Sequence, residues 1–195
     1  FSDAADLFVF ISGYTASFVY AKMMLERGFV VGATRLFKRV WQLYVAHIVL
    51  LVIYVAAIGS VAQFYRDADI INEFNIAGFI ENPIQTLTHG LLLSFKPLNL
   101  DVLLLYIVLM GFFPPVLWMM LRRPDLTMIG SLVLYFAARQ FGWNLHAYPY
   151  GGWYFNPFAW QLLFMFGAWF ALGGAIESRS IIRSRVLLYL GVGYL

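Results

Sequence analysis

Apolar runs of about 20 residues recur along this chain, and they constrain its fold more than any other feature. A helix needs about 20 such residues to cross the hydrocarbon core of a bilayer. Candidate spans cover residues 4–21, 40–62, 102–121 and 157–176, a weaker one begins at Leu126, and a truncated one begins near Val186. We therefore predict an all-α fold, a polytopic transmembrane helix bundle with about five full spans and a truncated sixth, forming a single domain over residues 1–195.

The composition excludes the other broad classes of protein. Hydrophobic residues make up 62% of the 195 residues and charged residues 12%, against about 45–50% and about 25% in soluble domains. A soluble domain has too little interior for that much apolar surface. The absence of cysteine excludes disulfides and thiolate metal sites, and no nucleotide-binding glycine loop or HExxH motif is present. We expect no bound metal or cofactor.

Positive charge is unevenly divided between the two sets of connecting segments. Ten of the 13 Lys and Arg residues fall on one side of the membrane when the spans alternate. These are Lys22, Arg27, Arg35, Lys38, Arg39, Arg122, Arg123, Arg179, Arg183 and Arg185. Cytoplasmic loops carry such an excess, so we place these loops in the cytoplasm and residue 1 on the outer side. The net charge of +3 then reflects orientation, and no nucleic-acid partner is expected.

Two groups of charged residues lie at the ends of predicted spans. Asp3 and Asp6 share one helix face at the start of the first span; they either cap the helix or orient a catalytic base. Arg35, Lys38 and Arg39 form a stripe where the second span begins. This stripe either anchors the span in the cytoplasm or clamps the phosphates of a nucleotide-bearing donor.

The three histidines admit two interpretations each. His47 lies deeper in the second span and is either a hydrogen-bonded packing residue or a base. His89 and His146 lie in outer segments. His89 belongs to an apolar stretch over residues 87–95 that is too short to cross the membrane. Each of these two is either structural or a general base. The short stretch itself predicts a surface-lying or re-entrant helix.

The segment over residues 140–156 is rich in Trp, Tyr, Gly and Asn. Such aromatic residues form either an interfacial belt or a platform that stacks on carbohydrate. Asn156 and Gln161 cannot ionise, so they would bind rather than catalyse, and Asp101 either caps the third span or contributes to binding. The candidates for binding an acceptor molecule are Asp101, Trp143, His146, Tyr148, Trp153, Tyr154, Asn156 and Gln161.

Four ordered stretches resemble one known family. DLFVFISG over residues 6–13 is similar to a motif of the membrane acyltransferase superfamily called acyltransferase 3, although Val9 replaces one of two consecutive Phe residues. Together, FSDAADLFVFISGY (1–14), RVWQLYVAH (39–47), KPLNLDVLLLYIVL (96–109) and GWYFNPFAWQLLF (152–164) resemble its OpgC branch. The superfamily's catalytic His lies one span earlier, so we expect this numbering to begin at about the second span and this stretch alone to be inactive.

The resemblance implies an O-acyltransferase of the bacterial inner membrane. It implies succinyl transfer from acyl-CoA, as co-substrate, to hydroxyls of osmoregulated periplasmic glucans. It assigns Asp3 or Asp6 to support of the catalytic His, and Arg35, Lys38 and Arg39 to the acyl donor. Two alternatives from other classes remain: a membrane transporter or flippase without covalent chemistry, and a non-catalytic scaffold for glucan synthesis.

Overall fold

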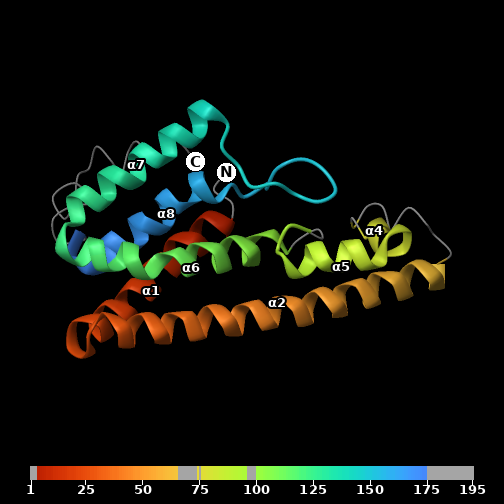
Figure 1. Cartoon of the computed structure of the whole chain (residues 1–195), viewed down its shortest axis with the longest axis horizontal. Coiled ribbons are helices and arrows are strands. Elements are labelled where there is room, and N and C mark those ends of the chain that lie inside the picture. Colours follow the sequence, from red (N-terminus) through yellow and green to blue (C-terminus); the bar gives the residue numbers. More distant parts are fainter. Residues whose placement is uncertain (1–3, 66–73, 75, 96–99, 175–195) are drawn as a thin grey trace. The chain divides into compact units, whose positions relative to one another are not determined.

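The computed structural model describes residues 4–65, 74, 76–95 and 100–174, and helices dominate this part of the chain (Figure 1). Its elements are α1 (Ala4–Arg27), α2 (Phe29–Tyr65), α4 (Ala77–Glu81), α5 (Pro83–Leu91), α6 (Asp101–Arg122), α7 (Pro124–Phe141), α8 (Pro157–Trp169) and the π-helical η1 (Phe170–Gly174). The described residues contain two isolated β-bridges and no strand. The predicted all-α fold is confirmed.

Four of these helices are long and apolar enough to cross a membrane: α1, α2, α6, and α8 together with η1. They match the first, second, third and fifth predicted spans. The fourth prediction corresponds to α7, an 18-residue helix that continues past Arg139, but it is not among the four. Its span therefore stays a prediction, and the truncated sixth span lies outside the described residues.

Two helices differ in length or course from the apolar runs that predicted them. Helix α2 has 37 residues and begins at Phe29, so it includes the basic stripe as well as the apolar run. Helix α6 continues through Pro114 and Pro115 to Arg122, although prolines inside an apolar run predict a kink or an end to its regular part. The short apolar stretch at residues 87–95 overlaps α5 and the turn that follows it.

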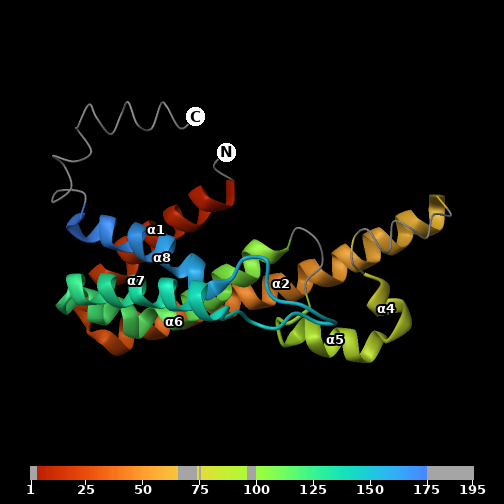
Figure 2. The same cartoon turned by 90° about the horizontal axis from the view of Figure 1, so that it is seen from above.

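The chain divides into two compact units, one of residues 1–35, 112–135 and 160–195, the other of residues 36–111 and 136–159. We describe each by itself, and the single domain stays a prediction. In the first unit, α1 and α8 lie side by side (Figures 1 and 2). The backbone of Gly13 approaches that of Phe164, and Gly167 approaches Phe10. These two contacts run in opposite order along the helices, so α1 and α8 pack antiparallel through glycine.

In the second unit, α5 packs against α2. The Tyr44 hydroxyl donates a hydrogen bond to the carbonyl oxygen of Leu91 (2.9 Å). A Cβ placed on Gly90 would lie 2.8 Å from Leu51 Cδ2, so the two helices are close together at this point. His47 and Leu51, one turn apart on α2, are both buried. The C-terminal end of α5 is thus held in place on the membrane-spanning α2.

Candidate functional site

The segment between α7 and α8 folds back on itself as a small hairpin. The N–H of Ala147 donates to the carbonyl of Gly151 (3.0 Å), and the N–H of Trp153 donates to the carbonyl of Leu145 (3.0 Å). The Asn144 amide also donates to the carbonyl of Trp153 (2.9 Å). Gly151 has φ +89°, a conformation that side-chain-bearing residues rarely adopt. The turn therefore requires the glycine that the sequence supplies.

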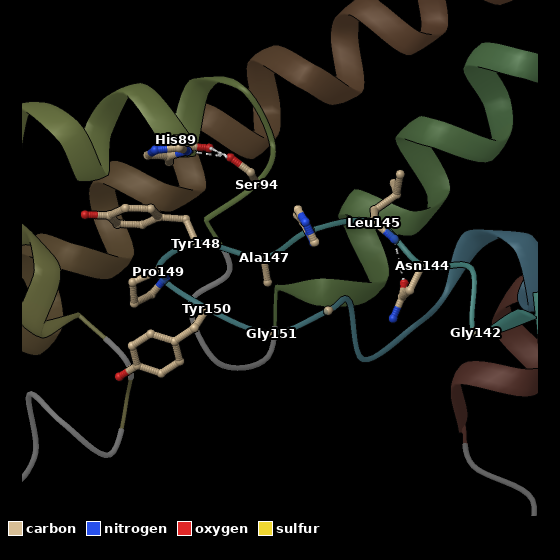
Figure 3. Close-up of a pocket in the computed structure, with 12 residues that line it drawn as sticks. His89, Ser94, Gly142, Asn144, Leu145, Ala147, Tyr148, Pro149, Tyr150 and Gly151 are labelled. Atoms are coloured by element: carbon tan, nitrogen blue, oxygen red, sulfur yellow. Dashed lines mark hydrogen bonds between the residues drawn. The ribbon is translucent and has the colours of Figure 1, made fainter.

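The hairpin is attached to the end of α5. The N–H of Tyr148 donates to the carbonyl of Ser94 (2.8 Å), next to a β-bridge between Phe95 and Tyr148. The rings of His89 and Tyr148 stack with their centroids 4.0 Å apart and their planes 10° apart. Figure 3 shows this stack beside Ser94. Two segments about 55 residues apart in sequence are thus joined by backbone and side-chain contacts.

The turn after α5 fixes the position of the His89 side chain. The carbonyl oxygen of His89 accepts hydrogen bonds from the N–H groups of Ser94 (2.9 Å) and Phe95 (3.0 Å). The Ser94 Oγ lies 2.9 Å from His89 Nδ1 and 3.2 Å from the His89 carbonyl oxygen. No described residue forms a hydrogen bond with His89 Nε2. One ring nitrogen is therefore occupied and the other is available.

These residues enclose an open pocket of about 710 Å³. Its described lining consists of His89, Ser94, Gly142 and residues 144–152, and none of these is Asp, Glu, Lys or Arg. The polar groups are amides, hydroxyls and imidazoles, and aromatic rings lie among them. Neutral polar groups with aromatic faces suit an uncharged, hydroxyl-rich ligand better than an ion. Within the described residues, no group of three acidic or His side chains could hold a metal.

The structure brings only two of the predicted acceptor-binding residues, His146 and Tyr148, into the pocket lining. Tyr154 is 78% exposed and Trp143 is 48% exposed, but neither lines the pocket. Trp153 is 5% exposed, which leaves no open ring face for stacking.

The other three acceptor-binding candidates lie in helices or at their ends. Asn156 caps α8, because its Oδ1 accepts from the N–H of Phe158 (3.0 Å), and its amide donates to the carbonyl of Trp143 (2.6 Å). Gln161 belongs to the other unit, where it exchanges two hydrogen bonds with Ser131 (2.6 and 2.8 Å). Asp101 is the first residue of α6 and is half-buried. A role in binding the acceptor stays a prediction for each.

The charged candidates among the described residues lie in helices. Asp6 is in the first turn of α1 and is half-buried, whereas Asp3 lies outside the described residues. Arg35, Lys38 and Arg39 are all exposed in α2. None of the three forms an ion pair with a described residue. They can therefore bind an anionic ligand or lipid headgroup.

Two features of the second unit were not predicted. His89 and Ser94 line the pocket because the turn after α5 returns toward the hairpin. A His five residues before a Ser is not a recognisable motif, so the sequence did not indicate that these two residues line a pocket. His47 is fully buried, and neither of its nitrogens has a hydrogen-bond partner among the described residues. The predicted hydrogen bond of a packing His47 is therefore not seen in this part of the chain.

The apolar helices indicate a multi-pass membrane protein, and the segment between α7 and α8 lines an open pocket without Asp, Glu, Lys or Arg among its described residues. A search of curated proteins and a search of solved structures found no match. The family model described as OpgC protein matches residues 1–195. The chain therefore belongs to the OpgC family, in agreement with the sequence motifs. Membership suggests a role in the modification of osmoregulated periplasmic glucans.

Proposed function

We propose that this chain is part of a membrane O-acyltransferase that transfers a succinyl group from acyl-CoA to a hydroxyl of a periplasmic glucan. The observation that carries this proposal is the pocket lining at Gly142 and residues 144–152, which holds aromatic side chains and no Asp, Glu, Lys or Arg. A neutral polysaccharide offers hydroxyls to amide and imidazole groups and apolar ring faces to aromatic side chains. Such a ligand needs no charged partner, and the described lining has none.

The basic stripe supports the donor half of the reaction. CoA carries several phosphate charges, and Arg and Lys bind phosphate through charge-assisted hydrogen bonds. Arg35, Lys38 and Arg39 are exposed at offsets of three and four residues in the continuous helix α2. In the orientation that we propose, these residues face the cytoplasm of a bacterial inner membrane and residue 1 faces the periplasm.

The chemistry is a substitution at a thioester. The oxygen of the glucan hydroxyl attacks the acyl carbonyl carbon, a C–O bond forms, the C–S bond breaks, and the hydroxyl proton passes through a base to the departing thiolate. By resemblance, the base would be the superfamily's His, which lies one span earlier than the DLFVFISG motif. Asp6, with Asp3 as the other candidate, would fix the tautomer of that His or balance its developing charge.

The test uses the full-length gene, expressed in cells that lack their own glucan succinyltransferase. We expect the extracted periplasmic glucans to gain negative charge and mass, and mild alkali to remove both because esters are alkali-labile. The Asp6→Asn variant, verified in the membrane, serves as a matched control with reduced transfer. Unchanged glucans with the wild-type protein in the membrane would refute the proposal, and glucan movement without covalent change would identify a transporter.

A further inference from the structure

The hydrogen bonds of its own turn orient the His89 ring. The His89 carbonyl oxygen accepts from the N–H groups of Ser94 and Phe95 and from the Ser94 hydroxyl (3.2 Å). The Ser94 Oγ also lies 2.9 Å from His89 Nδ1, where the tautomer of the ring sets which group donates. In either tautomer Nδ1 faces Ser94, and Nε2 has no hydrogen-bond partner among the described residues. Nε2 donates in one tautomer and accepts in the other, and a sugar hydroxyl can pair with either.

The stack with Tyr148 also orients the His89 ring. The Tyr148 ring covers one face of the imidazole at 4.0 Å, and the Tyr148 N–H is held by the carbonyl of Ser94. In Figure 3, the ring nitrogen turned away from Ser94 lies on the same side as the Tyr148 hydroxyl. No described residue forms a hydrogen bond with that hydroxyl. Two polar groups without described partners therefore lie at one edge of a stacked ring pair that lines the pocket.

We propose that His89 binds and orients the sugar acceptor through a hydrogen bond between Nε2 and a hydroxyl of a glucan residue in the pocket. Ser94 acts as a positioning residue, since its contact with Nδ1 orients the ring so that Nε2 is left for the ligand. The inference rests on the proposed function for the identity of the acceptor. Its physical content, a neutral hydroxyl-rich ligand at Nε2, is independent of the acyl-transfer chemistry.

Two substitutions separate the two nitrogens of His89. His89→Asn keeps a polar atom near the Nδ1 position, facing Ser94, and removes the group at Nε2. His89→Gln places an amide N–H near the Nε2 position. The assay uses the full-length protein, acyl-CoA and neutral glucan from cells that lack the transferase. We expect His89→Asn to raise the KM for glucan about three- to tenfold, as for the loss of one hydrogen bond. The KM for acyl-CoA and kcat should change less than about twofold, and the glucan KM of His89→Gln should be close to that of the wild type.

The matched control is Gln85→Ala, an exposed position on the same helix that does not line the pocket. It should leave all three kinetic constants unchanged. If the Asn variant does not accumulate in the membrane, His89→Phe replaces it, because Phe keeps the ring stack and removes both nitrogens. An unchanged glucan KM in the Asn or Phe variant, an equal rise in the Gln variant, or a loss confined to kcat would overturn the inference.

A binding measurement separates this inference from the proposed function. Equilibrium dialysis with radiolabelled neutral glucan, without acyl-CoA, compares the wild type with the Asn and Gln variants. Weaker glucan binding by the His89→Asn variant and normal binding by the His89→Gln variant would support the role of His89 even if no acyl transfer were detected. Acyl transfer by a wild type whose glucan affinity does not depend on His89 would support the proposed function and refute this inference.

Discussion

Replacing Gly13 with Ala should destabilise the protein by forcing two helices apart. A Cβ at this position would lie 2.8 Å from the carbonyl carbon of Phe164 and closer still to its oxygen. Carbon atoms in contact are separated by about 3.5–4.0 Å, so α1 and α8 must separate by about 1 Å at this point. The obstacle is backbone, which cannot rotate away as a flexible side chain can.

The expected magnitude is the difference between two opposing effects. Overpacking of a close contact costs about 1–3 kcal/mol, and the separation also weakens neighbouring contacts such as the Phe113–Phe164 ring pair, whose centroids are 5.0 Å apart. Ala in place of Gly favours the helix by up to about 1 kcal/mol. The net loss is about 1–2 kcal/mol, and at about 2–4 °C per kcal/mol the midpoint of thermal unfolding should fall by about 2–8 °C.

The assay is thermal unfolding of the purified full-length protein in detergent, followed by tryptophan fluorescence. Gly130→Ala is the control, because Gly130 lies in α7 of the same unit and a Cβ there meets nothing within 4 Å. That variant should unfold at the wild-type temperature or slightly above it. A midpoint for Gly13→Ala equal to or above that of Gly130→Ala would refute the reasoning.

The partner contact offers a second check of the same reasoning. At Gly167 a Cβ would lie 3.0 Å from the carbonyl carbon of Phe10, so Gly167→Ala should also destabilise the protein. The two substitutions belong to one interface, and the separation caused by the first makes room for the second. The double variant should therefore lose less stability than the sum of the single variants. Strict additivity would show that the two glycines do not report on one helix contact.

Three further predictions concern single side chains. Arg39→Ala should raise the KM for acyl-CoA about tenfold or more through loss of a charge-assisted hydrogen bond. Lys22→Ala, at an exposed residue paired with Glu26, is the control and should leave this KM unchanged. An unchanged KM for Arg39→Ala argues against the clamp. Asp6→Asn in the full-length protein should reduce kcat at least about tenfold with little change in either KM, and normal turnover would exclude the supporting role. Asn156→Ala should lower stability by about 1–2 kcal/mol through loss of the α8 cap, with Asn156→Asp milder; equal thermal midpoints for Ala and wild type would contradict the capping role.

Local patterns in the sequence were sufficient for the class of protein and most of its helices. Hydropathy is a property of consecutive residues, and a membrane span must satisfy its backbone hydrogen bonds within its own segment. Spans such as α1 and α6 could therefore be predicted from the sequence, and the basic stripe fell in α2 as expected. The family motifs are likewise short and local, which is why consecutive residues alone were enough to indicate the OpgC family.

The tertiary structure alone decided which residues meet. His89 reaches Tyr148 because α5 packs against α2 and the turn at residues 92–95 returns to the hairpin. Trp153 and Gln161 are both candidates for sugar binding by sequence, yet Trp153 is buried, and Gln161 hydrogen-bonds Ser131 within its own unit, which does not hold the pocket. Such pairings depend on helix register and backbone approach between segments distant in sequence, and the periodicity within any one segment carries no information about them.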